Sequence, residues 1–183
     1  MQKQMWILLW GDAMTNTKRI VLSAVLVSLA LAFSYMERFI PLQMLIPLPG
    51  VKLGLANVVT LIALYLLGTK SAFAILILRC FLGSLFGGGI TGFLFSITGG
   101  LLSMTVMALC KNAPLFSVYG VSILGAAAHN IGHILAAMVL MHSVYIGMYH
   151  SYLLVVALFT GFATGAACAG VLRILKTVNI SKK

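Results

Sequence analysis

Long apolar runs recur along almost the whole chain, and short breaks that hold proline, glycine or charged residues separate them. A membrane span needs about 20 consecutive apolar residues. Only 8% of the 183 residues are charged, whereas soluble domains carry about a quarter. The pattern therefore predicts an all-α membrane protein, a bundle of six transmembrane helices. The predicted spans are residues 20–36, 55–67, 71–86, 90–109, 119–141 and 152–172.

We expect a single six-helix membrane domain over residues 18–176, with a basic C-terminal tail over residues 177–183. Residues 1–17 form a lead-in that is either interfacial or non-native. The run 20–36 resembles a signal peptide and contains Ala30-Leu31-Ala32. Since the later runs are equally apolar, we interpret it as the first span.

The formal net charge of +10 does not indicate a nucleic-acid partner, because the basic residues are scattered singly and form no stripe. With an even number of spans, both termini lie on one side. Nine of the twelve basic residues fall on that side, only Arg38 and Lys52 fall on the other, and Arg79 lies within a span. The positive-inside rule then predicts a multi-pass protein of the cell membrane with both termini in the cytoplasm.

The residues that several kinds of catalytic or metal site require are absent from this sequence. No Asp follows Asp12, so paired carboxylates and Asp-rich magnesium sites are missing. There is no P-loop, and no Cys-x-x-Cys pair. Cys80, Cys110 and Cys168 lie in or beside apolar runs and are interpreted as small buried side chains. We therefore expect no enzyme activity, no cofactor and no metal.

The segment 37–57 separates the first two runs and holds three of the four prolines. Proline stops a helix and favours extended structure before it. The segment also holds Glu37, the only acid after Asp12, together with Arg38 and Lys52. We expect a folded loop at a membrane boundary that forms one wall of the functional site. An ordinary connector with incidental charges is the alternative.

Arg79 lies nine residues after Lys70, which places it roughly 13 Å into the bilayer. A charge at that depth should face the protein interior and have a partner. Two interpretations remain open. Arg79 either forms an internal ion pair with Glu37 or meets an anionic substrate that enters from outside.

His129-Asn130-Ile131-Gly132-His133 lies at a similar depth in the fifth run. His129 and His133 are four residues apart and share one helix face, with Asn130 adjacent to it. Polar side chains in hydrocarbon need partners or a wet cavity. Hydrogen bonding between helices, lining of a binding site, a metal site and a proton relay are the alternatives.

These groups together predict a positively biased cavity that is open to the outside and suits a carboxylate or phosphate group. Its aliphatic and aromatic lining suits an apolar tail or ring. The expected substrate-binding residues are Glu37, Arg38, Lys52, Asn57, Arg79, His129, Asn130 and His133.

Small side chains recur every four residues in the first run, at Ala24, Ser28 and Ala32. They share one helix face, and small faces let another helix approach closely in lipid. The partner helix is either a neighbouring span of this chain or a separate subunit.

At these residues the chain resembles the Gx transporter family, also named heptaprenyl diphosphate synthase component I. The matching pieces are Met36-Glu37-Arg38, the block Pro-Leu-Pro-Gly-Val-Lys-Leu-Gly-Leu-Ala-Asn over residues 47–57, Arg79 and His129-Asn130-Ile131-Gly132. His133 departs from the family pattern, which has Gln there. That departure weakens a metal site built on two histidines.

The family in turn resembles the substrate-binding S components of energy-coupling factor (ECF) transporters. The resemblance implies six spans, cytoplasmic termini and an outward-facing pocket for an anionic small molecule. It also implies docking through Ala24, Ser28 and Ala32 onto a transmembrane coupling subunit, which two ATPase subunits drive. The alternatives are an accessory subunit of isoprenoid (prenyl diphosphate) synthesis and a non-transporting membrane protein such as an electron-transfer scaffold.

Overall fold

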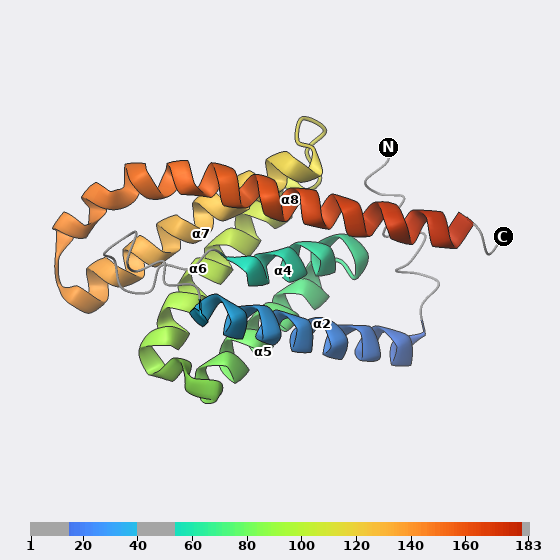
Figure 1. Ribbon diagram of the computed structural model, residues 1–183, viewed down its shortest axis with the longest axis horizontal. Coiled ribbons are helices and arrows are strands. Elements are labelled where there is room, and N and C mark those ends of the chain that lie inside the picture. The colour runs from blue at the N-terminus through green and yellow to red at the C-terminus, as the bar shows by residue number, and fades with distance from the viewer. Residues whose placement is uncertain (1–14, 40–53, 181–183) are drawn as a thin grey trace.

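The structure is a computed structural model that describes residues 15–39 and 54–180. Within these two ranges every regular element is a helix (Figure 1). The α-helices are α2 (Asn16–Met36), α4 (Leu55–Leu66), α5 (Thr69–Gly83), α6 (Gly89–Cys110), α7 (Val118–Met141) and α8 (His150–Ile180). Three short elements join them, namely the 3-10 helices η1 (Glu37–Phe39) and η3 (Val144–Tyr149) and the π-helix η2 (Ser84–Gly88).

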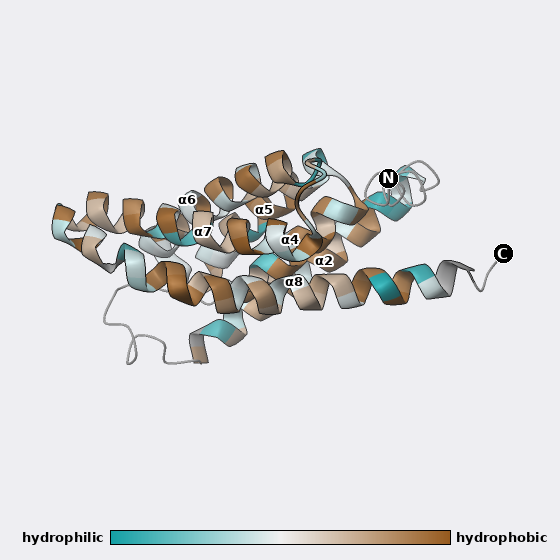
Figure 2. Ribbon diagram, turned by 90° about the horizontal axis from the view of Figure 1, so that it is seen from above, coloured by the Kyte–Doolittle hydropathy of each residue, from teal (hydrophilic) through white to brown (hydrophobic). Residues whose placement is uncertain are grey.

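Four helical stretches are long and apolar enough to cross a membrane, namely Asn16–Met36, Thr69–Cys110, Val118–Met141 and His150–Thr177. Most residues of these helices are apolar (Figure 2). Many large apolar side chains are exposed, as expected for side chains that face lipid. The prediction of an all-α, multi-pass membrane protein is therefore confirmed.

Each predicted run falls on an α-helix, but the described residues do not show six separate spans. Helix α4 has 12 residues, so it is about 18 Å long, well short of a hydrocarbon core of about 30 Å. Helix α5 has 15 residues and continues through η2 into α6. Helix α8 runs to Ile180, beyond the expected domain end at residue 176.

The predicted glycine break between the third and fourth runs is present at η2. Gly87 and Gly89 have φ values of +99° and +61°, a region that glycine enters without a steric penalty. Phe86 also leaves the helical region, with ψ at +36°. The chain turns back here, so that α5 and α6 run separately (Figure 1).

A close backbone contact joins α6 to α7 at Gly99 and Gly132. A Cβ on Gly132 would lie 2.7 Å from Gly99 Cα and 2.8 Å from Thr98 O. The two backbones therefore touch, which only glycine allows. Gly161 and Gly165 of α8 make a second close contact, against the backbone of α7.

Lys111 ties the end of α6 to the end of α4. Its side chain is buried, and Nζ donates a hydrogen bond to Leu64 O at 3.0 Å. A cation at a helix C-terminus satisfies an unpaired carbonyl and complements the helix dipole. Burial lowers the pKa of the Lys111 ammonium below its usual range. The sequence placed Lys111 in a loop but gave no sign of this internal contact.

Replacing Gly132 with Ala should separate α6 from α7, because the nearest atoms to the new Cβ belong to backbone. We expect Gly132→Ala to destabilise the protein by about 1–3 kcal/mol, measured as a lower thermal unfolding midpoint in detergent. The matched control is Gly92→Ala on α6, where no atom lies within 4 Å of a Cβ. It should leave the midpoint unchanged or raise it slightly. Equal thermal unfolding midpoints for Gly132→Ala and Gly92→Ala would contradict the close contact between the α6 and α7 backbones.

Candidate functional site

A buried polar cluster lies where α2, α4, α5, α6 and α7 meet. Its ionisable and amide side chains are all less than 10% exposed, and they are Glu37, Asn57, Arg79, His129 and His133. They line a cavity of about 20 Å³, called the Arg79 cavity below, together with Ser34, Gly54, Ala56 and Ser96. The structure thus brings five of the eight expected site residues together from four different helical segments.

Arg79 is the cation of this cavity, and its hydrogen bonding is incomplete. Its Nη2 donates to Asn57 Oδ1 at 3.2 Å. Its buried Nε has no hydrogen-bond partner within the described ranges. An unsatisfied donor on a buried charge costs several kcal/mol. The guanidinium is therefore prepared to bind one more acceptor, which a water molecule or an anion can supply.

Glu37 connects α2 to α4. Its Oε1 accepts a hydrogen bond from the Leu55 backbone N–H at 2.6 Å. Leu55 is the first residue of α4, where a carboxylate satisfies an unpaired N–H and meets the positive end of the helix dipole. Glu37 thereby holds the end of α2 against the start of α4.

His129 and His133 lie side by side on one face of α7, with ring centroids 4.4 Å apart and ring planes tilted by 41°. The His133 ring lies directly over Gly99, where any side chain would clash with it, and its centroid is 5.7 Å from that of Phe95. The close α6–α7 contact therefore fixes the position of both imidazoles. Within the ranges described, no group of three or more His, Cys, Asp or Glu side chains is placed to hold a metal ion.

Asn130 lies outside the Arg79 cavity, although the sequence grouped it with the histidines. Its Nδ2 donates to Leu153 O at 2.8 Å and so links α7 to α8. It lines a neighbouring cavity of about 10 Å³ with Ser103, Ser122 and Thr164, which also borders Asn57 and His129. Ser122 and Thr164 share a hydrogen bond of 2.6 Å between their hydroxyls. For Asn130 the structure thus shows hydrogen bonding between helices.

Two of the expected binding residues cannot be placed. Lys52 and the side chain of Arg38 lie outside the described residues. Two serines of the Arg79 cavity were missed from the sequence, namely Ser34 and Ser96. Ser34 lies three residues before Glu37 and hence on the same helix face. That spacing is the signal that could have identified it.

The expected docking residues Ala24, Ser28 and Ala32 are all exposed on α2. The Ser28 hydroxyl donates to Ala24 O at 3.0 Å within the helix. The face of α2 that packs inward carries Leu26, Val27 and Ala30 instead. The small side chains are therefore not used in packing against the described helices of this chain.

The Arg79 cavity has room for about one water molecule, since a water site needs at least about 10–15 Å³. In this form the cavity is closed to a larger solute. Binding of a solute at Arg79 therefore requires one wall to move. Helix α2 is the least buried of the four spanning stretches, so its displacement breaks the fewest packing contacts.

The Arg79–Asn57 hydrogen bond should appear as a coupling energy in a double-mutant cycle. Asn57→Leu leaves the buried guanidinium without its amide partner and should destabilise the protein by about 1–3 kcal/mol. Asn57→Leu combined with Arg79→Met should cost less than the sum of the single changes. Unfolding free energies in detergent give the coupling. Additive effects would show that the two side chains do not interact.

Comparison with known proteins places the chain in a family. No curated protein matches it, and no solved structure matches it. A family model described as heptaprenyl diphosphate synthase component I matches residues 26–171, which include all side chains of the Arg79 cavity. The match spans most of the described helices, so the chain belongs to the heptaprenyl diphosphate synthase component I family.

Proposed function

We propose that the protein is the substrate-binding membrane subunit of an ATP-driven importer of the ECF type, and that it captures an anionic small molecule from the outer side of the membrane. The observation that carries the proposal is the buried guanidinium of Arg79, whose Nε lacks a partner within the described ranges. The sequence holds no P-loop, so an ATP-driven step would need other subunits. The proposal therefore includes a transmembrane coupling subunit and two ATPase subunits.

The Nε donor of Arg79, unused within the described ranges, favours an anionic ligand. Arg79 and two imidazoles line the cavity, and Glu37, the carboxylate among its described lining residues, accepts a hydrogen bond from Leu55 at the start of α4. Attraction between opposite charges is much stronger in a low-dielectric interior than in water. A carboxylate or phosphate group would also satisfy the Nε donor of Arg79.

The distribution of basic residues supports a six-span arrangement with cytoplasmic termini. The start of α2, the turn between α4 and α5 and the end of α8 lie at one end of the molecule (Figure 1). Lys18 and Arg19, Lys70, and Arg173 and Lys176 lie at these three places. Under the positive-inside rule this end faces the cytoplasm, and the end of α2 with Glu37 faces outward. In this arrangement α4 and α5 are short spans.

Docking of the coupling subunit fits the exposed small face of α2. Ala24, Ser28 and Ala32 are accessible, whereas Gly161 and Gly165 of α8 are covered by α7. In lipid, helices associate through close packing rather than through the hydrophobic effect, so small exposed residues favour a helical partner.

The family's name favours a second candidate, an accessory subunit of prenyl diphosphate synthesis. In that function the chain would stimulate a soluble catalytic partner and need no ATPase. Reconstitution of chain elongation with and without the purified protein separates the two candidates, because a transport subunit gives no stimulation.

Removal of the Arg79 charge should abolish capture of an anionic ligand. Small molecules that copurify with the protein from native membranes would be identified by mass spectrometry. We expect an anionic compound with the wild type and none with Arg79→Gln, because the buried counter-charge is lost. Lys70→Gln is the matched control, since Lys70 is exposed at the start of α5. Equal retention by Arg79→Gln would overturn the proposal.

A large side chain on the small face of α2 should prevent assembly with the coupling subunit. We expect Ser28→Leu to reduce copurification of the membrane and ATPase partners at least about tenfold, because the helices can no longer approach closely. The control is Gly170→Leu on α8, at an exposed position with no atom within 4 Å of a Cβ. Full assembly of Ser28→Leu would rule out this docking face.

A further inference from the structure

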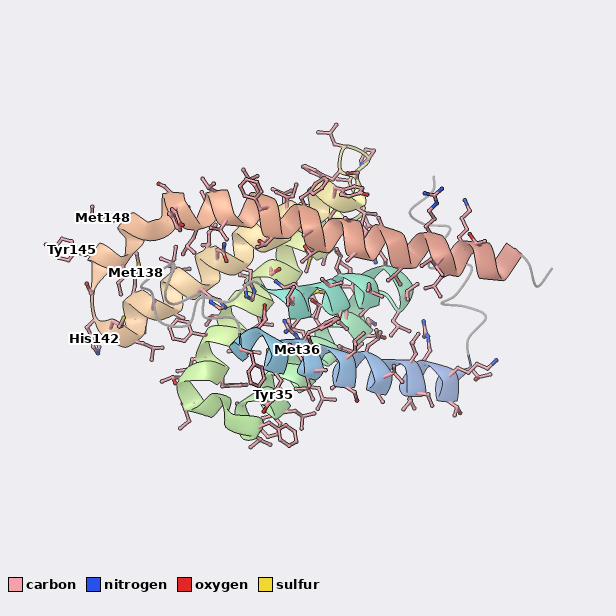
Figure 3. The ribbon with its side chains drawn as sticks, in the orientation of Figure 1. Tyr35, Met36, Met138, His142, Tyr145 and Met148 are labelled. Carbon is pink, nitrogen blue, oxygen red and sulfur yellow. The ribbon has the colours of Figure 1, made fainter. Side chains whose placement is uncertain are left out.

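An open groove lies on the outside of the helix bundle, between α2 and the turn from α5 into η2. It has a volume of about 430 Å³ and is lined by Leu31, Ala32, Ser34, Tyr35, Gly83 and Phe86. Figure 3 shows Tyr35 on the side of α2 that faces this turn. The volume lies within the range of small-molecule sites, about 300–1,000 Å³. This feature is called the lateral groove below.

The lateral groove lies beside the polar cluster and shares one lining residue with its cavity. Ser34 lines both the groove and the Arg79 cavity. Gly83 lies four residues after Arg79 on α5 and therefore on the same helix face. Both walls of the groove thus lead, within one helical turn, to the buried guanidinium.

The groove exists because one residue on each of its two walls has a small side chain or none. Gly83 has no side chain to fill the space beside α5, and the nearest atom to a Cβ added there would be Leu31 Cδ2 at 3.7 Å. The non-helical backbone at Phe86 and Gly87 ends the regular wall of α5 just beyond this point. Ala32 is small and exposed on the facing wall.

We propose that the lateral groove takes the single apolar chain of an anionic amphiphile, whose phosphate or carboxylate head reaches Arg79 past Ser34. The inference rests on the proposed function and narrows its ligand to a lipid-soluble class that enters sideways from the bilayer. An apolar chain fits an apolar groove that opens to lipid. The Nε of Arg79, in the neighbouring cavity that shares Ser34 with the groove, would donate to the charged head. A protein helix in the groove would leave that donor unsatisfied.

Binding of dodecyl phosphate to the full-length protein in lipid nanodiscs tests this inference, with laurate as the carboxylate probe. Methyl phosphate lacks the tail, and dodecanol lacks the charge. We expect binding of at least one of the two charged amphiphiles, lost in Arg79→Gln, and no comparable binding of methyl phosphate or dodecanol. If the wild type binds neither dodecyl phosphate nor laurate, the inference is overturned. The experiment on ligands that copurify with Arg79→Gln tests the proposed function separately.

Large side chains introduced into the groove test its role in ligand binding separately from the role of the Arg79 charge. Gly83→Leu and Ala32→Phe, introduced from opposite walls, should each weaken binding of the charged amphiphile about tenfold or more, because the chain and the new side chain compete for one space. Gly92→Leu, whose site is open and outside the groove, should bind as the wild type does. Unchanged amphiphile binding in both groove variants would overturn the inference. If those variants instead lost the coupling subunit, the groove would be a protein contact.

Discussion

The contact between the backbones of α6 and α7 at Gly99 and Gly132 is the constraint on which the site depends. It brings the two helices so close that the His133 ring lies on Gly99, and His129 follows one turn earlier on the same face. Any larger residue at either glycine would move the imidazoles away from Arg79. In lipid no hydrophobic force compensates for a poor fit between helices, so the two glycines position the polar cluster as well as the fold.

Polar residues inside this bundle have two separate uses. Glu37, Asn130 and Lys111 each bond a backbone group of another segment, namely Leu55 N–H, Leu153 O and Leu64 O. The Leu55 N–H and the Leu64 carbonyl lie at the two ends of α4, where hydrocarbon would leave them unpaired. Arg79 differs, because one of its donors remains unused in the described ranges. Unfilled hydrogen-bonding capacity on a buried charge is what distinguishes a candidate ligand site from structural polar contacts.

The sequence predicted the helices well because apolar run length determines them, and it predicted that Arg79 and the histidines meet because residues in hydrocarbon face inward. It did not predict how the polar groups pair. The spacing of small residues is the same on α2, at Ala24, Ser28 and Ala32, as on α8 at Gly161 and Gly165. Yet the first face is exposed and the second is covered by α7. Pairing and coverage depend on tertiary contacts, which periodicity does not encode.

Helix α2 joins the separate parts of the proposed mechanism. It carries the exposed small face, one wall of the lateral groove, and Ser34 and Glu37 of the Arg79 cavity. It is also the least buried of the spanning stretches. A cavity with room for one water can admit a ligand head only if a wall moves, and α2 is the wall that the fewest contacts hold. In the proposed importer, docking of the coupling subunit and opening of the Arg79 cavity would therefore both involve α2. A coupling subunit that binds one position of α2 more tightly than another would change the affinity of the Arg79 cavity for its ligand.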